Sequence, residues 1–395
     1  MSSENTTQDQ DFSEVARPGQ SRTDPAELGS RLQKWLRTKL PADADPQVTD
    51  VQVPAANGMS NETVLFDALW NEDGQQRHHY LVARIAPAPT GVPIFPSYNI
   101  AQQFDVIKTV GEHSPVPVPR VYWSEPSPEP LGGEFFVMER VDGLVPPDVM
   151  PYNFGSWVSE GSDEDRRRLQ DASVRVLADL HAIPEPAQLF PSLRDDLGSG
   201  AVTADAALRA HVDGQRRYYE WVVESGPRVP LIERALDWLD AHWPSVTGPA
   251  VLCWGDSRVG NVIYRDFEPA AVLDWEMAAL GPREIDLGWM IFQHRFFEDL
   301  AGVAGLPGLP GFLRREDVVA KYREISGHEA ADLDFYTLYA ALRHAIIMFR
   351  VQSRAVAFGQ APAPEDPNDM ILHRKTVEEM LDGTYWDRVN GQGVA

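Results

Sequence analysis

The stretch from residue 250 to residue 276 constrains the fold more than any other part of the chain. Residues 250–253 are apolar and predict a short buried strand. This strand leads to Asp256 and to a polar loop that ends at Asn261. A buried strand that delivers a carboxylate and an amide into one short loop makes this loop the first candidate site.

A β-hairpin follows the loop. Residues 262–264 and 270–273 predict two strands joined by a turn, and Asp274 comes directly after the second strand. The hairpin therefore returns a second carboxylate to a loop that already holds Asp256 and Asn261. A metal-dependent phosphate enzyme needs this arrangement, because one aspartate can take or orient a proton while an asparagine and another aspartate hold Mg²⁺ on phosphate oxygens.

The composition narrows the possible partners and compartments. The chain has 395 residues and a net charge of −24, which argues against non-specific binding to nucleic acid or to an anionic membrane. Its single cysteine, Cys253, allows no intramolecular disulfide, suits a reducing cytoplasm and is expected to be a core residue. No secretory signal is visible, and charged residues interrupt the apolar segment 333–349, which therefore predicts a buried helix rather than a membrane span.

Arginine is the expected phosphate-binding residue. Lysine supplies only five of the 35 basic residues, and no Gly-x-x-x-x-Gly-Lys-[Ser/Thr] sequence supports a P-loop fold. Arg84 lies on a mostly apolar predicted strand, on the same face as Tyr80 and Val82. Such an arginine is either a rim residue that reaches solvent or a residue that reaches an anion in a cleft.

The period of the hydrophobic pattern divides the chain into two lobes. Residues 1–22 are polar and predict disorder, and residues 23–143 predict an N-terminal lobe with a leading helix. Alternating patterns predict five strands in this lobe, with one helix inserted at residues 99–110. The expected strands are residues 48–53, 62–70, 78–85, 116–122 and 134–141.

Residues 144–385 predict a mainly helical C-terminal lobe, entered through a proline-rich linker at residues 144–150. The last helix is expected at about residues 369–382, and residues 386–395 are expected to be a flexible tail. The longer helices are expected at residues 163–183, 206–224, 231–243, 284–299, 315–325 and 332–354.

These residues carry a family resemblance. Asp256 and Asn261 have the Asp-x-x-x-x-Asn spacing of the kinase catalytic loop, and Asp274 follows a hairpin as the metal-binding aspartate of kinases does. Val82-Ala-Arg84 resembles the strand that carries the phosphate-binding lysine. With the turn at residues 58–63 and the sequence Leu-Asp-Trp-Glu at 273–276, the chain resembles the aminoglycoside phosphotransferase family of kinase-like enzymes, and most closely its actinobacterial members.

The resemblance implies an α+β, two-lobed protein-kinase-like fold that binds ATP and Mg²⁺. Asp256 would then orient or deprotonate the acceptor hydroxyl, while Asn261 and Asp274 would bind Mg²⁺. Arg258 lies where protein kinases place a lysine that meets the transferred phosphoryl group, and we assign it that role as a hypothesis. Asp286 would brace the catalytic loop through backbone N–H groups.

The resemblance also implies how the nucleotide is held. Arg84 would reach the α- and β-phosphates, and a turn that contains Ser60 and Asn61 would lie over the phosphates. The adenine would meet the backbone of the segment that follows the last strand and would lie between two apolar side chains. These residues are Glu139, Arg140 and Val141 for the backbone and Val82 and Ile263 for the side chains.

Three departures from the family pattern bear on activity. Trp254 stands where the family has histidine, which puts the geometry of the loop in question. Arg84 replaces lysine, and its wider guanidinium is not the same point charge. Gln103 aligns best with the helix glutamate that usually pairs with this basic residue, and a neutral partner would position Arg84 less firmly. Gln103 is either such a partner or a plain residue of the helix surface.

Two other functions are considered. Trp254 and Gln103 favour a nucleotide-binding pseudokinase that acts as a regulatory or scaffold module, whereas a protein kinase would need an activation loop that does not follow Glu276. The expected partner is a small molecule with a hydroxyl group, whose identity the sequence leaves open, as it leaves open the oligomeric state.

Glu276 is either a further metal-side acid or a hairpin-end charge. Residues that either line a substrate pocket or lie in solvent are His294, Arg295, Glu298, Arg343 and His344, and Tyr218, Tyr219 and Trp221 are expected in the core.

Overall fold

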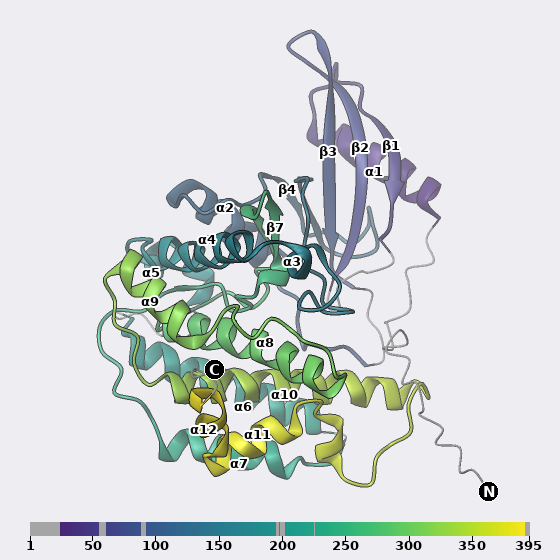
Figure 1. Cartoon of the computed structure of the whole chain (residues 1–395). Coiled ribbons are helices and arrows are strands. Elements are labelled where there is room, and N and C mark those ends of the chain that lie inside the picture. The colour runs from purple at the N-terminus through teal and green to yellow at the C-terminus, as the bar shows by residue number, and fades with distance from the viewer. Residues whose placement is uncertain are drawn as a thin grey trace, which may run out of the picture.

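The structure, a computed structural model, describes residues 24–54, 61–87, 92–194, 197, 202–224 and 226–391. These residues form a lobe built on one β-sheet and a larger helical lobe (Figure 1). The predicted α+β architecture with two lobes is confirmed. The segment 1–22 and Ser60, both subjects of prediction, lie outside the described residues.

The N-terminal lobe contains a five-stranded antiparallel sheet in the order β1-β2-β3-β5-β4. The strands are β1 (Gln47–Gln52), β2 (Glu62–Glu72), β3 (Gln75–Ile85), β4 (Val121–Glu125) and β5 (Phe135–Glu139). Asp73 and Gly74 join β2 to β3 with φ angles of 51° and 76°. Asp-Gly favours such a left-handed two-residue turn, and the resulting register pairs Thr63 with Arg84.

Alternation along β3 separates two packing layers. Leu81 and Ala83 lie in a cluster with Leu32 of α1 (Pro25–Lys39), which covers one face of the sheet. Val82 lies in a different cluster, which includes α2 (Ile100–His113) and the helical lobe. Arg84 shares the face of Val82, so its side chain is directed toward the C-terminal lobe.

Strand β4 lies farther along the chain than the sequence predicts. The prediction placed this strand at residues 116–122, whereas the structure forms Val121–Glu125. Pro117 and Pro119 explain the difference, because proline has no N–H to donate to a strand ladder.

The C-terminal lobe is helical, as predicted. Its helices are α3 (Trp157–Glu160), α4 (Asp163–His181), α5 (Pro186–Leu189), α6 (Ala204–Val223), α7 (Pro230–Ala241), α8 (Glu284–Val303), α9 (Arg315–Ser326), α10 (Leu333–Ala357), α11 (Arg374–Asp382) and α12 (Thr384–Gly391). Helix α10 packs against α8 and is buried along most of its length, as expected for residues 333–349. Among the described residues, no helix combines the length and apolarity that a membrane span needs.

Helix α12 occupies most of the segment that was predicted to be a flexible tail. Tyr385 is only 1% exposed, and Arg388 forms ion pairs with Glu379 and Asp299 over 2.9 Å each. Gly383 ends α11 with a φ of 84°, and the chain then turns back. Two adjacent aromatic residues are too short a signal to reveal this helix, so the prediction for residues 386–391 was wrong.

Two small β-pairs support the stretch with which the sequence analysis began. β7 (Val262–Arg265) and β8 (Glu268–Val272) form the predicted hairpin. β6 (Val251–Cys253) pairs instead with β9 (Ala279–Gly281), a three-residue strand that was not predicted. The predicted linker is tied to this region, because Leu144 forms an antiparallel bridge with Tyr264.

Several histidines of the helical lobe are buried. Burial lowers the pKa of His294 to about 3 and that of His373 to about 4. His373 stacks on His344 with ring centroids 4.8 Å apart, and burial also lowers the pKa of His344 well below its ordinary value. The fold therefore accepts these side chains in their neutral form.

We predict that the free energy of unfolding falls as the pH is lowered from about 6.5 to about 4. In the unfolded chain these histidines take up a proton near pH 6.5, while in the folded chain they stay neutral, so the unfolded state binds more protons in this window. Each histidine contributes a slope of at most about 1.4 kcal/mol per pH unit. Urea unfolding at several pH values measures the slope.

The variant His373→Gln isolates one of these contributions, because glutamine can keep a hydrogen bond to the Ala341 carbonyl that His373 contacts over 2.9 Å. Its slope should be shallower than that of the wild type. The matched control is His113→Gln, since His113 is exposed at the end of α2. Identical slopes in all three proteins would contradict the prediction.

Candidate active site

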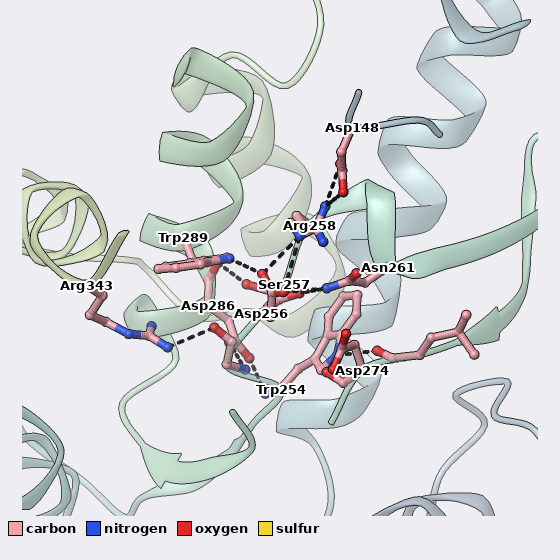
Figure 2. Close-up of polar contacts among 12 residues, drawn as sticks. Asp148, Trp254, Asp256, Ser257, Arg258, Asn261, Asp274, Asp286, Trp289 and Arg343 are labelled. Atoms are coloured by element: carbon pink, nitrogen blue, oxygen red, sulfur yellow. Dashed lines mark hydrogen bonds and ion pairs between the residues drawn. The ribbon is translucent and has the colours of Figure 1, made fainter. Parts of the chain in front are cut away.

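Asp256 lies in the loop between β6 and β7, and each of its carboxylate oxygens accepts a hydrogen bond (Figure 2). Asn261 donates from Nδ2 to Asp256 Oδ2 over 2.7 Å, so the residues matched by spacing do meet. The indole Nε1 of Trp289, on α8, donates to Asp256 Oδ1 over 2.7 Å. Sequence reasoning missed Trp289, because α8 is apolar nearly all round and offers no polar signal at that position.

The loop is braced from below by Asp286, which is fully buried. The backbone N–H groups of Trp254 and Gly255 donate to its two carboxylate oxygens over 2.7 and 2.8 Å. Gly255 has a φ of 88°, and a Cβ there would lie 2.0 Å from the Met277 carbonyl oxygen, so only glycine fits. These contacts are the bracing contacts predicted for Asp286.

Trp254 ties the loop to the hairpin that returns to it. Its side chain is 1% exposed, and its indole Nε1 donates to the carbonyl oxygens of Leu273 and Asp274 over 2.9 and 3.2 Å (Figure 2). The substituted residue therefore contacts both the loop and the strand end that carries Asp274. The loop keeps its hydrogen bonds to Asp286 with tryptophan in place of histidine.

Arg258 lies between two carboxylates. Its Nε is 3.2 Å from Asp256, and its Nη1 donates to Asp148 Oδ1 over 2.6 Å (Figure 2). Burial alone would lower the pKa of Arg258, but the charges of Asp256 and Asp148 raise it above its ordinary value. Sequence reasoning missed Asp148, because it lies in the proline-rich segment that was read as a linker.

Arg84 of β3 crosses between the lobes to the acids that follow the hairpin. Its Nη2 is 3.0 Å from Asp274 Oδ1 and 4.0 Å from Glu276 Oε2. Asn61 also crosses, and its Nδ2 donates to Glu276 Oε2 over 3.0 Å. Asp274 has a φ of 58°, a left-handed conformation that is uncommon for a residue with a side chain and is frequent at functional sites.

Gln103 does not take the place of the helix glutamate. It is 2% exposed, and its Nε2 donates to the Tyr98 carbonyl within the entry to α2. The acidic partners of Arg84 come from the C-terminal lobe instead. Both the predicted pairing of Gln103 with Arg84 and the alternative of a plain helix-surface residue were therefore wrong.

Among Glu139, Arg140 and Val141, the residues assigned to the adenine edge, one has an available backbone N–H. The amides of Glu139 and Arg140 donate to the carbonyls of Arg120 and Tyr80 over 2.8 and 2.9 Å. Within the described part of the chain, the Val141 N–H makes no hydrogen bond to backbone or side chain. The Arg140 side chain points away from this segment's backbone, because it pairs with Asp67 over 2.8 Å.

The two apolar residues assigned to the adenine lie near this segment. Val82 pairs with Met138, which precedes Glu139, the last residue of β5. Ile263 contacts the crossing at Gly143, where an added Cβ would lie 2.4 Å from Ile263 Cγ2. Gly143 has a φ of 150°, so this close crossing of β7 also requires glycine.

The residues predicted to bind Mg²⁺ offer suitable ligand atoms. Because the amide nitrogen of Asn261 donates to Asp256, its amide oxygen is directed elsewhere, and Asp274 adds a carboxylate. Such oxygen atoms are the ligands that Mg²⁺ prefers.

A second group, His181, Cys253 and Asp286, has its ligand atoms within 4.8 Å of one another. Burial raises the pKa of Cys253 well above its ordinary value, and the other two side chains bond to each other, so this group is a packed core contact.

A cavity of about 220 Å³ opens beside the Asp256 loop. Tyr218 and Arg343 line it, together with Glu276 and Met277 from the chain after the hairpin. The other polar residues considered for a substrate pocket do not line it: His294 and Glu298 bond to Tyr152 and Asn153, and His344 stacks on His373. Tyr219 is a core residue, as expected.

Comparison with known proteins agrees with this geometry. The Arabidopsis thaliana protein named "Probable acyl-CoA dehydrogenase IBR3" is 25% identical over 341 residues, which is 82% of this chain but only 39% of that protein. The chain thus spans less than half of that relative. A candidate aminoglycoside phosphotransferase from Ralstonia eutropha is 21% identical with a TM-score of 0.60, and the match covers 92% of this chain and 98% of that one.

A thermostable mutant of aminoglycoside phosphotransferase APH(4)-Ia, in a ternary complex with AMP-PNP and hygromycin B, has the same fold. It is 14% identical with a TM-score of 0.52, over 89% of this chain and 98% of that one. The model of the phosphotransferase enzyme family (APH) matches residues 52–314, which include strands β2 to β5, the Asp256 loop and the hairpin. Because this match covers well over half of the chain, the chain belongs to the phosphotransferase enzyme family.

Proposed function

We propose that this chain transfers the γ-phosphoryl group of ATP, with Mg²⁺, to a hydroxyl group of a small molecule. The observation that carries the proposal is the loop in which Trp289 and Asn261 fix the Asp256 carboxylate beside the acids that follow the hairpin. The AMP-PNP complex of the structural neighbour supports ATP as the nucleotide. The single cysteine supports a reducing compartment such as the cytoplasm.

Asp256 acts on the acceptor in this proposal. Its two hydrogen bonds hold the carboxylate in one orientation, so it can align the acceptor hydroxyl and accept its proton. Mg²⁺ held by Asn261 and Asp274 would neutralise charge on the phosphate oxygens. Catalysis would come mainly from position and charge, as is usual for phosphoryl transfer.

The two arginines of the site are assigned to phosphate groups. Arg84 and Arg258 each pair with one of the carboxylates that the proposal makes functional. When nucleotide binds, we expect Arg84 to pair with the α- and β-phosphates and Arg258 with the transferred phosphoryl group. Guanidinium groups suit this exchange, because they bind phosphate and carboxylate through the same paired donors.

The remaining nucleotide contacts are proposed from position. Ser60 and Asn61 lie over the phosphates in this proposal, and the Val141 N–H, with the backbone of Glu139 and Arg140, meets the adenine edge. Val82 and Ile263 would cover the adenine faces. Support comes from the free Val141 donor and from the close approach of Ile263 to Gly143.

The two alternatives have less support. A pseudokinase was favoured by Trp254 and Gln103, but Trp254 keeps its hydrogen bonds to the hairpin and Gln103 has no part in holding Arg84. A protein kinase would need an activation loop after Glu276. β9 (Ala279–Gly281) and α8, which starts at Glu284, leave no room for one.

We predict that Asp256→Asn lowers kcat by about 10²–10⁴-fold, because the general base is lost while the size of the side chain is kept. Its thermal stabilisation by Mg·ATP should persist. Asp274→Ala should instead lose that stabilisation together with turnover. ADP release and thermal shift, measured with Mg·ATP and a panel of hydroxyl acceptors, test both variants.

The matched control is Asp266→Asn, which changes an exposed turn aspartate of the same hairpin. It should behave as the wild type in both assays. If Asp256→Asn and Asp274→Ala keep wild-type turnover while folded, the proposed function is wrong. Stabilisation of the wild type by Mg·ATP without turnover on any acceptor would favour the pseudokinase.

We predict that Arg84→Met raises the KM for ATP by about 10–100-fold, which corresponds to one charge-assisted hydrogen bond. The same variant should bind Mg²⁺ alone more tightly than the wild type, because Asp274 loses its cationic partner. Steady-state kinetics and calorimetry measure the two effects.

Arg77→Met is the control for this variant, since Arg77 is an exposed arginine on the same strand, 3.7 Å from Glu72. It should alter neither quantity. If the KM for ATP is unchanged in Arg84→Met, Arg84 does not bind the nucleotide.

A further inference from the structure

The cavity beside the Asp256 loop contains a buried cation. Arg343 of α10 lines it and is only 1% exposed. Trp289 contacts both Arg343 and Asp256. Its indole N–H bonds to Asp256, and its ring lies 4.4 Å from the Arg343 guanidinium carbon. One side chain, that of Trp289, therefore links the Arg343 guanidinium of the cavity to the proposed catalytic carboxylate.

The Arg343 guanidinium is incompletely bonded. Nη2 donates to the Gly255 carbonyl over 3.1 Å (Figure 2). Nε and Nη1 are buried and have no hydrogen-bond partner among the described residues, and no carboxylate in that part of the chain lies within 4.0 Å. Burial lowers the pKa of Arg343 from its ordinary value, which reflects the cost of keeping the charge there.

This arrangement is unfavourable without a ligand. Taking a guanidinium out of water is costly, even after relaxation. Burial outweighs the charges of Asp286 and Asp256, which raise the pKa of Arg343, and the rings of Trp289 and Tyr339 lie 4.4 and 5.9 Å from the guanidinium carbon. These groups compensate the buried charge only in part, and an anion at the guanidinium would complete the compensation.

The other polar groups of the cavity are compatible with an anion. Burial and the charge of Arg343 lower the pKa of His211 to about 3, so His211 is neutral, and its Nδ1 bonds to Tyr339. Glu276 is the one acidic residue that lines the cavity within the described residues. Its carboxylate faces Asn61 and Arg84, 3.0 and 4.0 Å away, which offset its charge.

We propose that the acceptor is a small hydroxy acid, whose carboxylate binds the Arg343 guanidinium and whose hydroxyl is directed to Asp256. The placement of the hydroxyl at Asp256 rests on the proposed phosphotransferase function. Phe95, Met277 and Ile347 line the same cavity and would contact the apolar body of the acid.

The size and charge of the cavity favour this class over a polycationic sugar. A volume of about 220 Å³ lies below the range of about 300–1,000 Å³ that drug-sized ligands occupy. A polycation would also place its ammonium groups beside a buried guanidinium.

The test measures binding rather than turnover. Thermal shift is recorded for the full chain with 3-hydroxybutyrate and 4-hydroxycyclohexanecarboxylate, each beside its primary amide, which keeps the shape but not the charge. The acids should stabilise the wild type, and the amides should not. The variant Arg343→Met should lose stabilisation by the acids, with apparent affinity lower by about 10–100-fold.

Two further variants separate binding from folding. Without ligand, Arg343→Met should be at least as stable as the wild type, because an apolar side chain replaces a buried charge that is compensated only in part. A purely structural arginine would instead lose stability. Arg350→Met, on the same helix and bonded to the Pro93 carbonyl over 2.8 Å, is the control and should keep wild-type stabilisation by the acids.

The inference is overturned if the amides stabilise the wild type as well as the acids, if Arg343→Met keeps the response to the acids, or if neither acid stabilises the wild type. None of these results contradicts phosphoryl transfer to another acceptor. If the protein instead binds the acids through Arg343 but phosphorylates no acceptor, the acid-binding site is supported and the proposed phosphotransferase function is wrong. With an active enzyme, Arg343→Met should raise the KM for the acid and leave the KM for ATP unchanged.

Discussion

The site depends on the pair of hydrogen bonds that Asp286 accepts from the amides of Trp254 and Gly255. A buried carboxylate is costly unless donors surround it, and here two amides and His181 do so. In return, Asp286 fixes the backbone immediately before Asp256. The backbone of the loop is thereby positioned by helix α8, which also donates to Asp256 through Trp289.

Charge organises the site as strongly as packing does. Asp256, Asp148 and Asp274 would repel one another in an acidic chain if Arg258 and Arg84 did not lie between them. The carboxylates are thus held close together by arginines that phosphate oxygens can also bind. Arg343 differs, because it has no carboxylate partner among the described residues and contacts only a carbonyl and two aromatic rings.

The sequence predicted the parts of the site that are set by spacing along one hairpin, and with them the two-lobed fold. It could not predict partners that tertiary packing brings from other elements. Trp289 lies on a helix that is buried all round, and Asp148 lies in a proline-rich segment with no periodic pattern. Gln103 was misassigned for the same reason, since its alignment with a kinase glutamate says nothing about the Tyr98 carbonyl beside it.

The contacts between the lobes at the site follow from the arginine on β3. The Nη2 atom of Arg84 lies 3.0 Å from Asp274 and 4.0 Å from Glu276, and Asn61 adds a hydrogen bond to Glu276. A nucleotide that takes Arg84 must therefore replace the contacts that hold the sheet against the hairpin. Charge-assisted bonds to phosphate are stronger than a part-exposed ion pair, so the exchange can favour the nucleotide while the lobes remain joined through it.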